Sequence, residues 1–411
     1  MLRTSRRLAV ALPACLILVA LVALAGCGAA DLSSTPTTAP SSTPTADTPW
    51  GEHNSILRDD LGRSLEAFES GGTARVAFLG GSVTTFAWAD RVVDYLQDRF
   101  PDTEIDYVNA GLGGTPAELG AFRLEEEVFG HGPVDLLFLE FAVNTGSVEA
   151  MEGIVRHARE LSPDIDIVQV HIAAGWFDEP IEEGLAPWPV PDHETVADHY
   201  GNPSIHLYKE VYDQIADGLY TWEDFSPDGV HPADLGNDVY ADFVTAFLDD
   251  AWAASGDASP YGALPAPLTA HPWDSCSLQR YDDATSVIGF TEVVGWVPPG
   301  DWTNVLEPVD VFQASGPGAE IEFAFEGTMV GLFLAIGPDS GILDYRIDGG
   351  EWVTLDTVYD SWQPDDGTDP IPAYRLNYLL LDTELTEGGH TIVFRVPDVD
   401  GVVRFYRLMV G

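Results

Sequence analysis

The sequence predicts two folded domains in series, an α/β domain followed by an all-β domain. Three observations support this organisation. Short apolar runs alternate with segments of helical spacing through residues 74–252. Residues 259–267 (SPYGALPAP) form a linker, and beyond it short strands alternate with glycine-rich turns. The chain has 411 residues, of which 45% are hydrophobic, and this is sufficient for two cores.

The first fifty residues indicate export rather than fold. Three arginines precede an apolar run at residues 8–25, which ends in small residues, as is typical of a signal peptide. Residues 24–27 (LAGC) resemble the lipobox of bacterial lipoproteins, which implies cleavage before Cys27 and a lipid on its sulfur. A transmembrane anchor is the alternative. A lipid chain holds a protein at the bilayer without spanning it.

We therefore expect a lipoprotein signal peptide at residues 1–27 and a linker at residues 28–50. The linker is rich in Ser, Thr and Pro, so it buries little surface and stays extended. The expected location is extracytoplasmic, with the membrane contacted only through the lipid.

Charge and cysteine content exclude several partners. The net charge is −49, which repels nucleic acid and anionic lipid headgroups. Two of the three cysteines fall in residues 1–27, so only Cys276 remains and no disulfide is expected in the folded part. No Cys/His cluster has metal-ligand spacing, and we expect neither a metal nor another cofactor.

Strands and helices alternate through the first domain. The expected strands are residues 74–81, 105–110, 134–143, 165–172 and 204–208, and the expected helices are residues 86–100, 116–129, 148–161 and 234–252. This alternation predicts a parallel sheet covered on both faces. The chemistry of such sheets lies beyond the carboxyl ends of the strands.

Polar and glycine residues follow the first two strands. Ser82 stands after two glycines, where a strand-to-helix turn can expose its hydroxyl; a tight turn with a capping serine is the alternative. Gly111, Gly113 and Gly114 follow the second strand and offer backbone N–H donors, or form an ordinary flexible turn.

Two polar residues mark the end of the third strand. Asn144 is a neutral amide donor, or the first residue of an Asx turn. Glu140 lies within the apolar strand, and we expect a buried, hydrogen-bonded structural residue rather than a catalytic acid.

Asp228 and His231 stand three residues apart in a loop that two prolines stiffen. The carboxylate can accept a hydrogen bond from one ring nitrogen and leave the other facing a serine, as in a catalytic base. A helix-capping aspartate beside a surface histidine is the alternative.

These four motifs, in this order, resemble the blocks of the SGNH (GDSL-like) hydrolases over about residues 75–247. The resemblance implies a flavodoxin-like three-layer α/β/α domain, which we place at residues 51–260. It also implies a serine esterase with Ser82 as nucleophile and with Asp228 and His231 as its catalytic partners.

The resemblance further implies an oxyanion hole made by the Ser82 N–H, the Gly114 N–H and the Asn144 amide. Gly111 and Gly113 remain alternatives to Gly114. The sequence departs from the family pattern in Gly-Gly-Ser, where many members have Gly-Asp-Ser, and in Thr145, where aspartate is usual.

Three further residues are candidates for substrate contact. His171 ends the fourth strand and either lines the cleft or fills a structural position. Trp176 and Trp188 lie in a long irregular segment, residues 175–191, where they form a substrate wall or pack the loop.

Short strands separated by turns predict a β-sandwich at residues 268–411. The expected strands are residues 320–325, 329–335, 343–347, 352–356, 377–381, 391–396 and 402–409. Residues 331–350 resemble the jelly-roll domains that accompany carbohydrate esterases. Four tryptophans either fill the core, which we favour, or stack on sugars: Trp296, Trp302, Trp352 and Trp362.

The leading hypothesis is hydrolysis of acyl esters, with acetyl esters of a carbohydrate as the expected substrate. The partner is then an acylated carbohydrate or another small ester. An acyltransferase with the same triad, a lipase or phospholipase, and a non-catalytic glycan-binding lipoprotein remain alternatives.

Overall fold

The computed structural model describes residues 54–299, 302–357, 372–397 and 401–411. The predictions for residues 1–50, for Cys27 and for Trp362 lie outside these residues. Within them, no helix is both long enough and apolar enough to cross a membrane.

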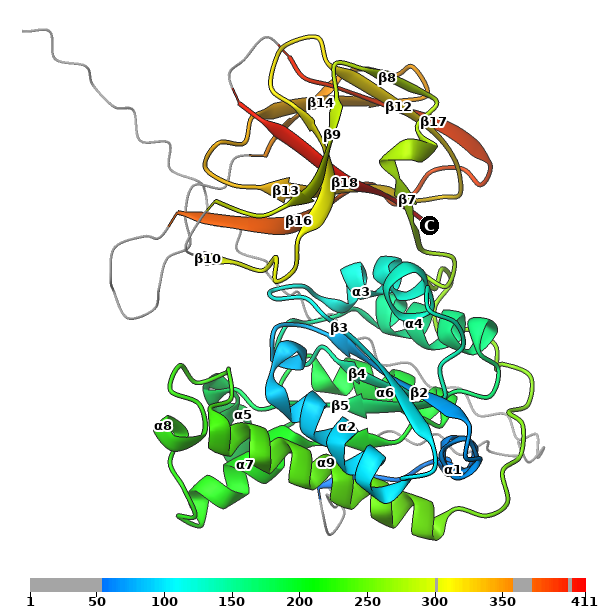
Figure 1. The fold of residues 1–411 in the computed structure, drawn as a ribbon, viewed down its shortest axis with the longest axis vertical. Helices are drawn as coiled ribbons and strands as arrows, with labels where there is room; N and C mark the ends of the chain where they lie inside the picture. The colour runs from blue at the N-terminus through cyan, green and yellow to red at the C-terminus, as the bar shows by residue number, and fades with distance from the viewer. Residues whose placement is uncertain (1–53, 300–301, 358–371, 398–400) are drawn as a thin grey trace, which may run out of the picture. The chain divides into compact units, whose positions relative to one another are not determined.

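The first domain is built on a six-stranded sheet in the order β1-β6-β5-β4-β2-β3. Its strands β2, β3, β4 and β5 are labelled in Figure 1. All neighbours are parallel except the edge pair β1–β6. Numbered in chain order from β2, the five parallel strands stand in the order 2-1-3-4-5, which is the predicted flavodoxin-like order. The strands are β1 (Ser55–Ile56), β2 (Thr73–Gly80), β3 (Glu104–Gly111), β4 (Leu136–Glu140), β5 (Asp166–Val170) and β6 (Ser204–Ile205).

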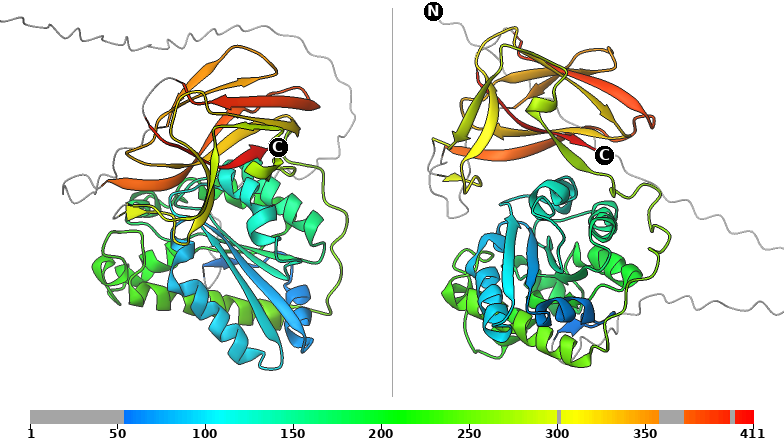
Figure 2. Two further views of the ribbon diagram at one scale, coloured as in Figure 1. Left: turned by 45° about the horizontal axis from the view of Figure 1, so that its top comes forward. Right: turned by 45° about the vertical axis from the view of Figure 1, so that its right-hand side comes forward.

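Helices cover both faces of this sheet (Figure 1; Figure 2). Along β2, Val76 and Phe78 belong to one hydrophobic cluster, whereas Ala77 and Leu79 belong to another, because successive strand residues point to opposite faces. The helices are α1 (Gly62–Glu69), α2 (Ala87–Arg99), α3 (Ala117–Arg123), α4 (Val148–Leu161), α5 (Asp178–Glu182), α6 (Val190–Tyr200), α7 (Leu207–Ala216), α8 (Trp222–Phe225) and α9 (Asp234–Ala254).

All five predicted strands are present, although the fifth is shorter than expected, and helices form in all four predicted segments. The prediction of a strand at residues 204–208 was wrong beyond Ile205, since α7 begins at Leu207. The predicted helix at residues 116–129 divides into α3 and a π-helical turn, η2 (Leu124–Val128). The irregular segment at residues 175–191 contains a short helix, α5.

The second domain is a sandwich of two mainly antiparallel sheets, as predicted. One sheet has the order β10-β16-β13-β18-β11-β9, with β7 also pairing with β18, and the other has the order β15-β14-β17-β12-β8. The strands are β7 (Ser277–Arg280), β8 (Ser286–Ile288), β9 (Thr291–Trp296), β10 (Trp302–Thr303), β11 (Val309–Ala314), β12 (Glu320–Glu326), β13 (Val330–Ile336), β14 (Ile342–Ile347), β15 (Val353–Asp356), β16 (Ala373–Asp382), β17 (Gly389–Arg395) and β18 (Val403–Val410).

All seven strands that the sequence predicted in this domain are present, but β7 to β11 were not predicted. Trp296 is buried against Tyr374, which agrees with a core position. Trp352 is partly buried, and its ring lies 3.8 Å from the guanidinium carbon of Arg395. The side chain of Trp302 lies outside the described residues.

The two domains share a packed interface. Phe122 of α3 and Phe333 of β13 belong to one hydrophobic cluster. The guanidinium of Arg407, on β18, forms an ion pair of 2.7 Å with Glu126 of η2. Both partners are more than half buried, so this face of the α/β domain is covered by the sandwich.

Candidate active site

Ser82 lies at the carboxyl end of β2, between β3 and β4, where the strand order of the sheet reverses. Open α/β sheets bind their ligands at this switch point. A short 3₁₀ turn, η1 (Val83–Thr85), follows Ser82 and leads into α2. The chain leaves the sheet abruptly here, so Ser82 is held on a tight turn rather than within a regular element.

Ser82, His231 and Asp228 form a continuous hydrogen-bonded chain. The Ser82 Oγ lies 2.8 Å from His231 Nε2, and His231 Nδ1 lies 2.7 Å from Asp228 Oδ2. The His231 ring and the Asp228 carboxylate both come from the loop between α8 and α9. In the sequence His231 lies 149 positions from Ser82, and the fold brings the two side chains together. This geometry suits a serine hydroxyl that transfers its proton to an oriented imidazole.

The second carboxylate oxygen of Asp228 holds the loop itself. It accepts hydrogen bonds from the backbone N–H of Val230 (3.0 Å), the N–H of His231 (2.8 Å) and the hydroxyl of Ser226 (3.1 Å). Desolvation opposes ionisation, but the bonds from the His231 ring and the two backbone groups outweigh it and hold the pKa of Asp228 below its usual range. The carboxylate is thus charged at neutral pH and can accept the Nδ1 proton.

Phe86 supports the histidine ring from one side. Its ring is stacked on that of His231, with 5.3 Å between centroids and 18° between planes. The side chain of His231 remains 36% exposed and that of Asp228 55% exposed, so both are accessible from solvent. Sequence analysis missed Phe86 and Ser226, because a supporting contact of this kind has no motif.

Asn144 packs directly against the serine turn. A β-carbon built on Gly81 would lie 1.8 Å from the Asn144 Oδ1, so only glycine at position 81 allows this approach. Thr145 has a φ of 74°, which is rare for a β-branched residue and costs about 1–3 kcal/mol. Its carbonyl accepts a bond of 3.1 Å from the N–H of Ala117, which helps to keep this loop in place.

The glycine-rich loop after β3 reaches the serine from the other side. A β-carbon on Gly113 would lie 3.7 Å from the β-carbon of Ser82, and Gly114 has a φ of 69°. Two sandwich residues that sequence analysis missed hold this loop. Asn304 donates to the Gly113 carbonyl at 2.9 Å, and Arg375 donates to the Gly114 carbonyl at 3.1 Å.

Glu140 is buried beneath the serine turn, in agreement with the structural role expected for it. Its Oε2 accepts a hydrogen bond of 2.8 Å from the hydroxyl of Thr84. Burial raises the pKa of Glu140 to about 8, although the bonds from Thr84 and the Gly81 backbone favour the charged form. A carboxyl with this pKa is mostly neutral at pH 7, so it places no full negative charge beneath the serine turn.

His171 is only 1% exposed and does not fit the substrate contact considered above. Its Nε2 lies 2.8 Å from Glu194 Oε1, and His206 Nε2 lies 3.4 Å from the same oxygen. The guanidinium of Arg58 binds Glu194 Oε2 at 2.5 Å. The three side chains are close enough to surround a metal ion, but Arg58 already neutralises Glu194 and places a positive charge beside it. We therefore interpret the cluster as a buried hydrogen-bonded network.

Trp176 and Trp188 are both exposed, with 57% and 64% of their surface accessible. The N–H of Gly175 donates to the carbonyl of Gly229 at 2.8 Å, so Trp176 stands next to the loop that carries Asp228. Trp188 is held by its indole N–H, which donates to Asp192 at 3.3 Å. Of the two, Trp176 is the one whose chain neighbour is hydrogen-bonded to the loop of the site.

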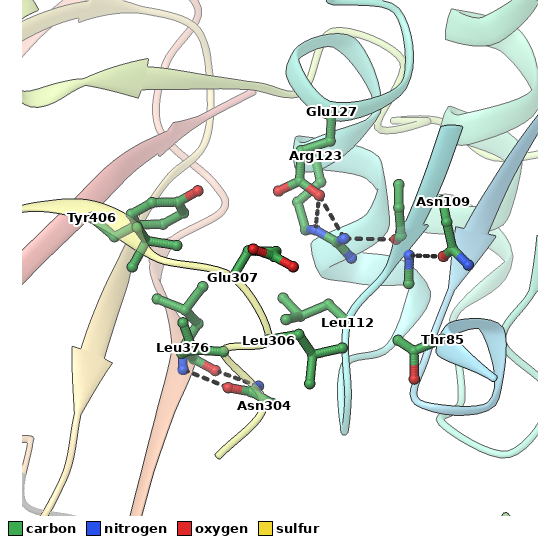
Figure 3. Close-up of a pocket in the computed structure, with 14 residues that line it drawn as sticks. Thr85, Asn109, Leu112, Arg123, Glu127, Asn304, Leu306, Glu307, Leu376 and Tyr406 are labelled. Atoms are coloured by element: carbon green, nitrogen blue, oxygen red, sulfur yellow. Dashed lines mark hydrogen bonds and ion pairs between the residues drawn. The ribbon is translucent and has the colours of Figure 1, made fainter. Parts of the chain in front are cut away.

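A cavity of about 390 Å³ lies between the glycine-rich loop and the sandwich (Figure 3). Its lining combines Thr85, Gly111 and Leu112 from the first domain with Asn304 and Leu376 from the second. Neither Ser82 nor His231 lines it. The cavity therefore adjoins the candidate site without containing its reactive atoms.

No protein-family model matches the chain, and a search of curated proteins gives no match. Among solved structures, the chain is similar to a two-domain esterase active on acetylated mannans. The form co-crystallized with mannopentaose is 22% identical, with 87% of this chain and 96% of that chain covered and a TM-score of 0.67. A second structure of that esterase gives 22% identity, coverage of 87% and 97%, and a TM-score of 0.70. The match spans both domains, so this chain shares its two-domain fold with that esterase.

Proposed function

We propose that the protein is a serine esterase that removes acetyl groups from a carbohydrate. The observation that carries the proposal is the unbroken hydrogen-bonded chain from the Ser82 hydroxyl through His231 to Asp228, at the switch point of the sheet. A serine hydroxyl is a poor nucleophile at neutral pH unless a base accepts its proton. His231 is that base, and Asp228 fixes the orientation of its ring.

In the proposed reaction, Ser82 Oγ attacks the acyl carbonyl carbon and its proton passes to His231 Nε2. The carbonyl oxygen becomes an oxyanion, which accepts hydrogen bonds from the Ser82 N–H, the Gly114 N–H and the Asn144 amide. When the tetrahedral intermediate collapses, the bond to the sugar oxygen breaks and His231 returns its proton to that oxygen. An acyl-serine remains.

The second half of the reaction repeats these steps with water. His231 accepts a proton from water as the water oxygen attacks the acyl-serine. Collapse of the second tetrahedral intermediate releases the carboxylic acid, and His231 restores the proton to Ser82. Asp228 stays ionised throughout and stabilises the imidazolium that forms twice in each cycle.

Several features support a carbohydrate ester as substrate. The related fold across both domains belongs to an esterase active on acetylated mannans. Trp176 has an exposed aromatic ring and directly follows Gly175, whose N–H binds the Asp228 loop; exposed aromatic rings can stack on sugar rings. The net charge of −49 favours a neutral glycan over an acidic one. A lipid on Cys27 would hold the enzyme at a membrane surface, where glycans are accessible.

The first test is hydrolysis of p-nitrophenyl acetate by the purified protein and by Ser82→Ala. Activity that disappears in the variant, with the thermal midpoint unchanged, supports the proposal. Equal rates in both proteins would remove Ser82 as nucleophile. A strong preference for long acyl chains over acetate would favour a lipase. Formation of an acetylated sugar from an acyl donor and a free sugar would favour the acyltransferase.

A further inference from the structure

Asn304 belongs to the sandwich, yet it contacts the loop proposed to supply an oxyanion donor. It follows β10 and is 5% exposed. Its Oδ1 accepts from the Leu376 N–H at 2.8 Å, and its Nδ2 donates to the Leu376 carbonyl at 3.1 Å (Figure 3). The same Nδ2 donates to the Gly113 carbonyl at 2.9 Å. The amide is thus fixed on β16 and directed at the glycine-rich loop.

Arg375, the residue before Leu376 on β16, makes a second contact of the same kind. Its guanidinium donates to the Gly114 carbonyl at 3.1 Å. Two consecutive carbonyls of the loop are therefore held from the sandwich. This part of the interface differs from the ion pair between Arg407 and Glu126, which contacts η2 and not the loop.

The bond to the Gly113 carbonyl determines the direction of the Gly114 N–H. The two groups belong to one trans peptide unit, in which C=O and N–H point in opposite directions. Glycine on both sides of this unit leaves its rotation almost unrestricted. The hydrogen bond from Asn304 removes that freedom, and so it keeps the N–H of Gly114 in a single orientation.

Packing shows how close this unit lies to the reactive serine. A β-carbon on Gly113 would be 3.3 Å from the β-carbon of Asn304 and 3.7 Å from that of Ser82. Gly113 therefore lies in the narrow space between the sandwich residue and the serine. A rotation of its peptide unit would therefore change the packing against Ser82.

We propose that Asn304 is a positioning residue for ester hydrolysis, which orients the Gly114 N–H toward the oxyanion. The sandwich is then part of the catalytic machinery, in addition to any role in glycan binding. This inference rests on the proposed esterase function. A preorganised donor is worth far more than one that must reorient during the reaction, because the reorganisation cost is met during folding.

The test compares Asn304→Asp with Glu126→Gln in the full protein, using p-nitrophenyl acetate. The aspartate keeps the acceptor for the Leu376 N–H but loses both donated bonds. Loss of one oxyanion donor lowers kcat by about 100- to 1000-fold. A donor that is still present but poorly oriented should cost less, so we expect a drop of about 10- to 100-fold in kcat with KM within about twofold. Glu126→Gln weakens the interface elsewhere and should keep kcat within about twofold.

A second variant guards against misfolding of the first. Arg375→Gln removes the partly exposed bond to Gly114 and should lower kcat by about two- to tenfold, with an unchanged thermal midpoint. If Asn304→Asp and Arg375→Gln both keep the parent kcat, the inference is wrong. Equal losses in all three variants would assign the effect to domain docking and also overturn it. If the parent itself is inactive while folded, the esterase proposal fails instead.

Discussion

Replacing Asp228 by asparagine should block the proton transfer while leaving the loop intact. The amide oxygen can keep the three bonds that Oδ1 accepts from Val230, His231 and Ser226. Its nitrogen would then face His231 Nδ1 across the present distance of 2.7 Å. An NH₂ group donates, so Nδ1 must accept and the ring proton must move to Nε2. That tautomer cannot take the proton of Ser82.

The opposite orientation of the amide at position 228, which would keep the ring proton on Nδ1, is unfavourable. It would place the NH₂ group against the two backbone N–H donors of Val230 and His231, with the loss of two hydrogen bonds, each worth about 1 kcal/mol. We therefore expect Asp228→Asn to lower kcat by about 10³- to 10⁴-fold, as the wrong tautomer does in a serine protease. This corresponds to about 4–5.5 kcal/mol of lost transition-state stabilisation.

The assay is steady-state hydrolysis of p-nitrophenyl acetate at neutral pH, with thermal unfolding as the control for folding. Asp228→Asn should unfold near the parent midpoint. Asp228→Ala loses the bonds that hold the loop and should unfold at a lower temperature. A kcat for Asp228→Asn within tenfold of the parent would refute the role assigned to the carboxylate.

Three further changes test the surroundings of the site. Gly81→Ala must displace Asn144 and should lower kcat by at least about 100-fold, whereas an unchanged kcat would exclude Asn144 from the oxyanion hole. Burial raises the pKa of Glu140 to about 8, so below its ordinary pKa the carboxyl is neutral in both the folded and the unfolded protein. As the pH rises toward 8, the carboxyl ionises in the unfolded protein first, and the free energy of unfolding falls. Unfolding experiments should show that the parent loses stability relative to Glu140→Gln between pH 5 and pH 8, by at most about 5 kcal/mol; parallel curves would contradict a buried neutral acid. Trp176→Ala should raise KM for an acetylated mannan by about fivefold or more but not KM for p-nitrophenyl acetate, and equal changes would argue against sugar stacking at this ring.

The central strands and the motifs at their ends were predictable because each depends on short-range patterns. The apolar runs of β2, β4 and β5 permit only buried strands, and the positions of Ser82 and Asn144 follow from where those strands end. The pairing of Asp228 with His231 could be predicted because only two residues of a stiff loop separate them. The strands β7 to β11 lack such continuous apolar runs, and they were missed.

The contacts between the domains could not be predicted from the sequence. Asn304 binds a backbone carbonyl, and carbonyls are present at every position, so no residue pattern marks the partner. The buried network around Glu194 was missed for a related reason. Glu194 binds Arg58 and two histidines that lie far apart in the chain, and His171 alone could be interpreted as a cleft residue.

The most direct test of the account is to identify the nucleophile chemically. The protein is incubated with a fluorophosphonate, which phosphonylates activated serines, and the modified peptide is identified by mass spectrometry. We predict a single adduct on Ser82 that forms as activity is lost, with far slower labelling in Asp228→Asn. An active protein that stays unlabelled at Ser82, or that is labelled at another serine as activity falls, would contradict the account.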